Sequence, residues 1–158
     1  MSERLKRLAP LIAKSELRGI KLAESSCHSL PAEMSESGEL DVRLKWSARA
    51  VLKSAGAFSV LADIEVLLIP SGAADGEGAR VWARFELRYF VPNDVELSEG
   101  LLEEFATTNG IFNAWSYWRE YVQSTLSRME LPPLSLPLYR VPAEEQKPAG
   151  AARSSKAV

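Results

Sequence analysis

The chain has 158 residues, a formal net charge of −2 at pH 7 and 46% hydrophobic residues. A chain of this size buries about 68–70% of its unfolded surface, so we expect one domain with a flexible end that needs neither disulfides nor metal. This net charge gives no electrostatic footprint for nucleic acid, whose binding requires clustered Lys and Arg, so we expect no nucleic-acid partner. The single Cys27 allows no intramolecular disulfide, and no apolar run reaches the length of a membrane-spanning helix. We therefore expect a cytoplasmic protein without membrane insertion.

The N-terminal stretch, residues 1–15, is basic and has apolar side chains at helical spacing. Lys6, Arg7 and Pro10 interrupt the apolar series, so the stretch does not resemble a secretory signal. We predict a short amphipathic helix that docks on the sheet described next. Its apolar side chains are Leu5, Leu8, Leu11 and Ile12.

Three stretches, residues 41–53, 57–69 and 80–91, alternate apolar and polar side chains. Successive side chains of a strand point to opposite faces, so this pattern predicts strands with one buried face. A weaker strand is expected at residues 16–26, where Gly19 dilutes the signal. Residues 27–38 then form a long connection before the first of the three strong strands.

Two helical stretches follow the strands. Ser98 is a candidate N-cap for the first helix, and Asn109-Gly110 is expected to end it, because both residues tolerate positive φ. A long helix is predicted at residues 112–129, and Pro132-Pro133 forbids its continuation.

Strands first and helices last indicate an α+β fold, with a four-stranded antiparallel sheet and two C-terminal helices packed on one face. The predicted organisation has three parts. It is an N-terminal amphipathic helix at 1–15, one domain at 16–140, and a disordered tail at 141–158 whose composition offers no apolar face.

Residues that could support catalysis are few. Cys27 and His28 are adjacent, but neighbouring residues on a strand or its exit point to opposite faces, so we interpret them as ordinary loop residues. One His and one Cys do not make a four-ligand metal site. Gly72, Gly76 and Gly78 lack the following helix and Lys that a phosphate cradle needs. We therefore expect no enzyme activity, no catalytic residues, no metal and no cofactor.

Aromatic side chains are concentrated on the predicted long helix. At about 100° per residue they cover more than half of its circumference, which exceeds what one sheet can bury. A second apolar surface is typical of an interaction site. The residues are Phe112, Trp115, Tyr117, Trp118 and Tyr121, and Trp82 and Phe90 lie on the otherwise polar face of the last strand.

The same region resembles the second helix and exit segment of the protein-export chaperone SecB. The similar residues are Asn109 to Val122 (NGIFNAWSYWREYV), Ser127-Arg128, and Leu131 to Leu136 (LPPLSL). With the strands upstream in the right order, the resemblance covers about residues 16–140. The N-terminal helix and Thr107-Thr108 are more similar to solitary SecB-like chaperones, some of which serve toxin–antitoxin systems.

The resemblance implies a SecB-like fold, dimers that pair into homotetramers, and a long apolar groove for unfolded or preprotein clients. No nucleotide or metal is implied. The expected groove residues are Leu30, Met34, Leu44, Trp46, Trp115 and Trp118. The expected residues of the oligomer interface are Phe85, Leu87 and Tyr89.

The resemblance also implies a docking face for the export motor SecA on the sheet, which is acidic in the family. Here Glu86 fits that face, but Lys21, Arg43, Arg49, Arg84 and Arg88 add positive charge to candidate outward positions. Whether SecA is a partner is therefore left open.

Three functions remain open from the sequence. The first is an ATP-independent holdase for unfolded or export-competent polypeptides, with possible delivery to the Sec translocase. The second is a dedicated chaperone of an antitoxin. The third, from a different class, is a small-ligand enzyme or carrier on a curved sheet, which would need convergent polar groups in a pocket.

Overall fold

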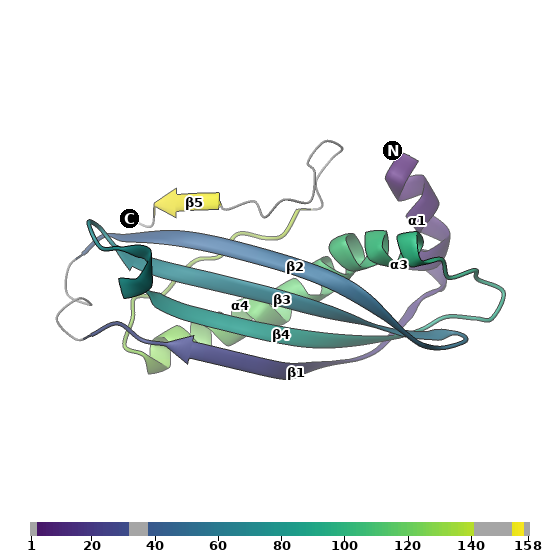
Figure 1. The fold of residues 1–158 in the computed structure, drawn as a ribbon, viewed down its shortest axis with the longest axis horizontal. Coiled ribbons are helices and arrows are strands. Elements are labelled where there is room, and N and C mark those ends of the chain that lie inside the picture. Colours follow the sequence, from purple (N-terminus) through teal and green to yellow (C-terminus); the bar gives the residue numbers. More distant parts are fainter. Residues whose placement is uncertain (1–2, 32–37, 141–152, 157–158) are drawn as a thin grey trace.

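A computed structural model describes residues 3–31, 38–140 and 153–156 of the chain (Figure 1). Its elements follow the predicted order of strands and then helices. They are α1 (Glu3–Lys14), β1 (Glu16–His28), β2 (Leu40–Ser54), β3 (Ala57–Pro70), the 3₁₀ turn η1 (Asp75–Glu77), β4 (Ala79–Phe90), α3 (Glu99–Phe105), the π-helical turn η2 (Ala106–Gly110), α4 (Ile111–Arg128) and β5 (Arg153–Lys156).

The strands form one antiparallel sheet in the order β1-β4-β3-β2-β5. β2 and β3 form a hairpin whose register runs from Leu40 opposite Pro70 to Ser54 opposite Ala57. Gly56 closes this hairpin with φ +80°, a conformation that L side chains rarely adopt. The four long strands confirm the sheet that alternation predicts.

β5 lies in the part of the chain for which the sequence predicts disorder. Arg153–Lys156 pairs antiparallel with Asp41 to Leu44 of β2, so the expectation of disorder does not hold for these four residues. A backbone can pair with an open strand edge without any apolar side chain, which is why composition gave no sign of it. The remaining residues of the tail lie outside the described part.

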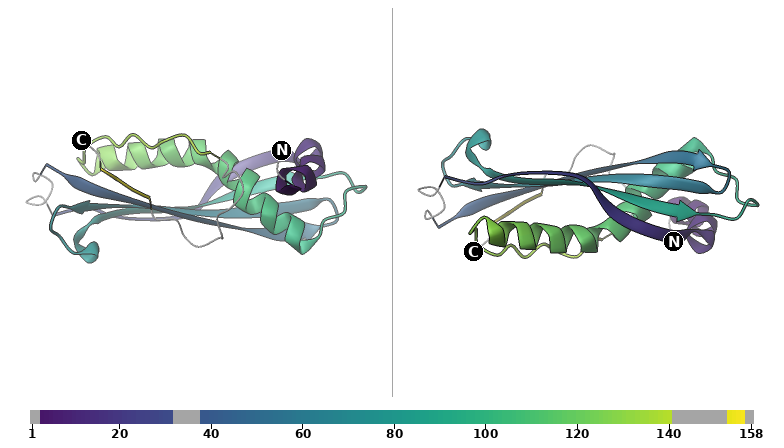
Figure 2. Two further views of the ribbon diagram at one scale, coloured as in Figure 1. Left: turned by 90° about the horizontal axis from the view of Figure 1, so that it is seen from above. Right: turned by 90° about the horizontal axis from the view of Figure 1, so that it is seen from below.

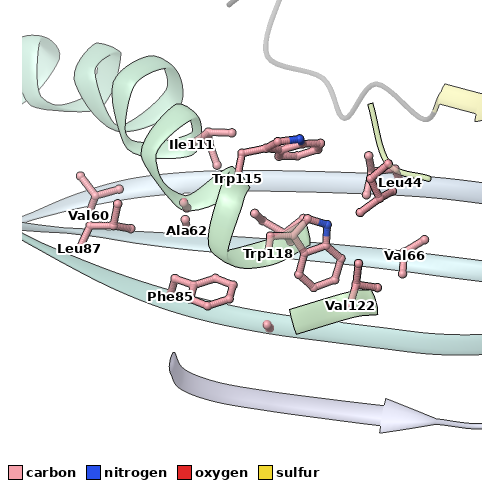
Figure 3. Packing of buried hydrophobic residues seen from close by; sticks show 14 of the residues in the cluster. Leu44, Val60, Ala62, Val66, Phe85, Leu87, Ile111, Trp115, Trp118 and Val122 are labelled. Atoms are coloured by element: carbon pink, nitrogen blue, oxygen red, sulfur yellow. The ribbon is translucent and has the colours of Figure 1, made fainter. Parts of the chain in front are cut away.

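One face of the sheet is covered by α3, η2 and α4 (Figure 2). Inward residues of β2, β3 and β4 pack against Ile111, Trp115, Trp118 and Val122 of α4 to form the core (Figure 3). Within the described residues, no helix is both long and apolar enough to cross a bilayer. The structure thus confirms an α+β fold with helices on one face.

The residues expected at the oligomer interface belong to this core. Phe85, Leu87 and Tyr89 are 4%, 0% and 3% exposed in a single chain. Tyr89 stacks on Phe58 at 5.1 Å, and Phe85 meets Tyr121 edge-on at 6.3 Å. These alternate residues of β4 do share one face of the sheet, as predicted. The prediction that they form the oligomer interface is wrong, because the chain's own helices cover that face.

The helix α3 begins where the sequence predicts, but the helical path does not end where the sequence predicts. The Ser98 hydroxyl accepts a hydrogen bond from the Leu101 N–H at 3.3 Å, which confirms the N-cap. The chain stays helical through Asn109-Gly110, and Gly110 has φ −60° and ψ −52°. A Cβ on Gly110 would lie 2.7 Å from Val60 Cγ1, so this glycine permits close helix–sheet approach instead of a turn.

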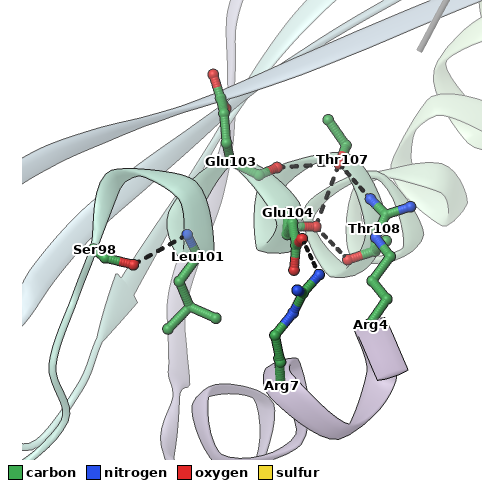
Figure 4. A network of polar contacts seen from close by, with 8 residues as sticks. All are labelled: Arg4, Arg7, Ser98, Leu101, Glu103, Glu104, Thr107 and Thr108. Carbon is green, nitrogen blue, oxygen red and sulfur yellow. Dashed lines mark hydrogen bonds and ion pairs between the residues drawn. The ribbon is translucent and has the colours of Figure 1, made fainter. Parts of the chain in front are cut away.

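α1 is confirmed as an amphipathic helix, and its main partner is α3 instead of the sheet. Its own side chains Leu8 and Leu11 are buried. Figure 4 shows the polar rim of this contact, where Arg7 pairs with Glu104 at 2.6 Å and Arg4 donates to the Thr107 hydroxyl at 2.9 Å. The helix thereby braces the π-helical turn between α3 and α4.

Candidate functional site

Three aromatic side chains from distant parts of the chain meet beside α4. Trp46 of β2 meets Trp115 of α4 edge-on at 5.7 Å between ring centroids. Tyr139 lies 6.0 Å from Trp46 and 5.2 Å from Trp115. We call these three residues the aromatic cluster. Such edge-on and tilted contacts are the geometry in which aromatic quadrupoles attract, so the rings support one another.

The segment after α4 holds the cluster in place. α4 ends at Arg128, Glu130 adopts φ 56°, and the chain then runs extended over residues 131–140, here called the exit segment. The Trp115 indole N–H donates to the Pro137 carbonyl at 2.8 Å. The buried leucines of the exit segment are Leu131, Leu134 and Leu136.

The structure places the expected groove residues at different depths. Leu30 and Leu44 are buried, and Trp46 is partly exposed beside Trp115, which is 4% exposed. Met34 lies outside the described residues. Trp118 is 0% exposed and packs near Tyr121, so it is a core residue and not a contact surface in this conformation. Among the expected pairs, the structure brings Trp46 and Trp115 together.

Tyr139 is the cluster residue that sequence reasoning missed. It is partly buried, and desolvation raises the pKa of its phenol. The available signal was an aromatic residue two positions after Pro137 in an apolar segment. Its two aromatic partners lie on distant elements, so only the fold shows the contact.

The chemistry of the cluster is that of an apolar contact surface. Its polar groups are the indole N–H groups and one phenol, and no nucleophile–base pair contributes to it. Cys27 and His28 lie on β1 opposite Val81 and Arg80, at the far side of the sheet from β2, so they occupy a strand and not the expected loop. In the described ranges, no group of three His, Cys, Asp or Glu side chains could hold a metal ion.

The outward face of the sheet carries ion pairs across its strands. The Arg84 guanidinium donates two hydrogen bonds, of 2.7 and 3.0 Å, to the Asp63 carboxylate. The Glu86 carboxylate accepts hydrogen bonds from Lys21 and Ser59, each at 3.0 Å. The bond from Lys21 is the main cause that lowers the pKa of Glu86. The acidic groups of this face are thus largely neutralised by their neighbours.

The exposed aromatic residues are spread over both faces. Phe112 and Tyr117 of α4 are 52% and 50% exposed, and Phe90 of β4 is 45% exposed. The sequence expectation that part of the aromatic set lies at the surface is therefore correct for these positions. Arg18 lies over the Phe90 ring at 5.2 Å, and Arg84 over the Trp82 ring at 5.6 Å.

Comparison with known proteins identifies the fold. No family model matches the chain, and no curated protein matches it in sequence. A solved structure of the Mycobacterium tuberculosis SecB-like chaperone Rv1957, in complex with a ChAD peptide from the HigA1 antitoxin Rv1956, is similar with a TM-score of 0.75. The similarity covers 87% of this chain and 99% of that chain at 22% identity.

A second similar structure is a protein of unknown function from Streptococcus agalactiae, with 9% identity and a TM-score of 0.47. The similarity covers 78% of this chain and 96% of that chain. The protein is thus an α+β protein with the SecB-like fold. The resemblance seen in the sequence is confirmed at the level of the fold.

Proposed function

We propose that this protein is a chaperone that binds unfolded polypeptide without ATP and acts as a binding protein, not as an enzyme. The observation that carries the proposal is the aromatic cluster, which lies at the border of the helix-covered face. Trp46 and Tyr139 are partly exposed, and Leu30 and Leu44 are buried residues of the expected groove. Planar aromatic groups tolerate many apolar partners, which suits clients that share only exposed hydrophobic segments.

The proposed client surface consists of Trp46, Trp115 and Tyr139, extended by Leu30, Leu44 and Met34. Trp118 is left out because it is fully buried. The exit segment covers part of this surface through the bond between Trp115 and Pro137, so deeper client contact requires the exit segment to shift. Individual contacts of this kind are weak, and several copies of the surface on one assembly would raise the affinity.

A homotetramer built as a dimer of dimers remains part of the proposal. Phe85, Leu87 and Tyr89 no longer serve as its interface. Leu17 and Leu22 of the edge strand β1 are 38% and 45% exposed, which offers apolar contact area to a second copy. Light scattering tests this point, and a monomeric wild type would contradict it.

A dedicated antitoxin chaperone is the second candidate. The specific observation is that the similar chaperone Rv1957 was solved with a peptide from an antitoxin. Delivery of clients to the Sec translocase through SecA has less support, because Glu86 and Asp63 on the outward face already hold cationic partners. Pull-down of a neighbouring gene's product would separate the dedicated role from the general one.

Client binding gives the direct test. Fluorescence anisotropy would measure binding of labelled, reduced and carboxymethylated α-lactalbumin, which stays unfolded. Loss of one large aromatic contact should weaken binding about tenfold or more in Trp46→Ala and Tyr139→Ala. Trp82→Ala, on the outward face, is the matched control and should bind as wild type does. Equal binding by all variants would mean that clients bind away from the aromatic cluster, and no binding by wild type would favour the third class, a small-ligand enzyme or carrier.

A further inference from the structure

The edge of the sheet beside the aromatic cluster is partly occupied by the chain's own C-terminal segment. β2 is a long strand, and β3 pairs with one side of it along its whole length. On its other side, β5 pairs with Asp41 to Leu44 only. From Lys45 to Ser54, that side has no strand partner among the described residues.

The sequence of β5 suits a replaceable occupant. Arg153-Ser154-Ser155-Lys156 contains no apolar side chain, so its pairing depends on the backbone. Backbone pairing of this kind exchanges bonds to water for bonds to protein and yields little net free energy per bond. It must also offset the conformational entropy that the four residues of β5 lose on pairing. A weakly held strand at this edge is therefore easily displaced.

The position of the edge favours an extended apolar competitor. Residues opposite each other in paired strands have side chains on the same face of the sheet. A strand added along β2 would align alternate side chains with Leu44 and Trp46, on the face where the aromatic cluster lies. Strand addition takes affinity from the backbone and specificity from such alternate contacts.

We propose that the outer edge of β2 binds an extended apolar client segment by strand addition across Leu44 and Trp46, and that β5, which pairs with Asp41 to Leu44, is a built-in competitor that this segment displaces. This inference rests on the proposed chaperone function. β5 reduces client binding at the edge in the free protein, and a client with alternating apolar side chains gains contacts that β5 lacks.

Locking β5 in place tests the displacement. Arg43 and Ser154 are cross-strand partners, so Arg43→Cys and Ser154→Cys, in a Cys27→Ser background, place two thiols in a position suitable for a disulfide. The probe is a fluorescein-labelled peptide of alternating Val and Thr. The oxidised protein should bind this peptide about tenfold or more weakly than its reduced form, and each single-cysteine variant should be unaffected by oxidation.

Releasing β5 tests the same claim in the opposite direction. N–H groups of consecutive strand residues point to opposite sides, so one of Ser154 and Ser155 directs its N–H toward β2. The double variant Ser154→Pro, Ser155→Pro removes that donor and should bind the peptide about two- to tenfold more tightly. The control, Ser154→Ala with Ser155→Ala, keeps both donors and should match wild type.

The outcomes separate this inference from the proposed function. If wild type binds unfolded α-lactalbumin while the locked, released and unmodified proteins bind the peptide equally, strand addition with displacement is wrong and the chaperone function stands. Failure of the pair to form a disulfide would also overturn the inference, because β5 would not lie on β2. If no form binds either probe, both the function and the inference fail.

Discussion

The indole N–H of Trp115 donates a 2.8 Å hydrogen bond to the carbonyl of Pro137, 22 residues further along the chain. This bond joins α4 to the exit segment and positions Tyr139 beside Trp115 and Trp46. The client surface that we propose is therefore assembled by the chain's return over its own helix.

Trp115→Phe should loosen the exit segment. Phenylalanine keeps an aromatic ring but has no N–H, so the Pro137 carbonyl loses its donor, at a cost of about 1 kcal/mol in the free energy of unfolding. Hydrogen exchange of the amides in residues 134–140 should accelerate while the strands stay protected. Trp82→Phe is the control and should leave this exchange unchanged; slow exchange in both variants would mean that the bond does not hold the segment.

Gly110→Ala should destabilise the domain. The new methyl would meet Val60 Cγ1 at 2.7 Å in a fully buried site, and overpacking of this kind costs about 1–3 kcal/mol. Adding Val60→Ala makes room, so the double variant should lose less stability than the sum of the single ones. Gly100→Ala in α3 has nothing within 4 Å of the new Cβ and should be neutral or stabilising. Urea unfolding of wild type, the two single variants, the double variant and Gly100→Ala measures these changes. Strictly additive losses of unfolding free energy in the double variant would contradict the steric argument.

Alkaline pH should weaken the fold through Tyr89. Burial raises the pKa of Tyr89 to about 12 in the folded protein, although a bond from Asn113 partly opposes this rise. In the unfolded state the phenol has a pKa of about 10, so the unfolded state loses this proton at a lower pH than the folded state does. The contribution of Tyr89 is thus fully present below about pH 10 and lost as pH rises through about 12, for a total of about 2–3 kcal/mol.

The comparison of Tyr89→Phe with wild type isolates this effect. The free energy of unfolding, measured in urea between about pH 8 and pH 11, should fall less for the variant than for wild type. The difference should reach about 1 kcal/mol at the upper end of this range. Tyr117→Phe, at a half-exposed position, should decline as wild type does. Parallel declines for Tyr89→Phe and wild type would show that Tyr89 is not responsible.

α1 should contribute to stability through its apolar side and little through its ion pairs. Leu11 is 1% exposed, so Leu11→Ala should cost about 2–5 kcal/mol. Arg7 pairs with Glu104 at the surface, where such pairs contribute about 0–1 kcal/mol, so Arg7→Ala should have a small effect. Thermal unfolding of both variants checks which one loses more stability. A larger loss for Arg7→Ala than for Leu11→Ala would contradict this prediction.

Local patterns predicted the strands and the start of α3 well. Alternation over residues 41–53, 57–69 and 80–91 identifies strands because a strand has two faces, and Ser98 caps a helix by a bond within one turn. The predicted end at Gly110 failed because glycine permits both a turn and a close contact. Only the nearness of Val60, from a distant strand, shows which applies.

Long-range contacts explain the errors at the candidate site. Alternation assigned Phe85, Leu87 and Tyr89 to one face of β4 but could not show that α3 and α4 cover that face. Trp115 and Trp118 look equivalent in the helical pattern, yet only Trp115 meets Trp46 and Tyr139. The contacts of Tyr139 depend on the path of the exit segment, which Trp115 joins through Pro137, and no local pattern encodes that path.

Suppression of aggregation without ATP tests the central claim most directly. Chemically denatured rhodanese would be diluted into buffer with wild type, Tyr139→Ala or Trp82→Ala, and light scattering would follow its aggregation. We predict that wild type and Trp82→Ala suppress scattering and that Tyr139→Ala, still folded by circular dichroism, suppresses it much less. Undiminished aggregation with wild type, or equal suppression by Tyr139→Ala, would contradict the proposed function at the aromatic cluster.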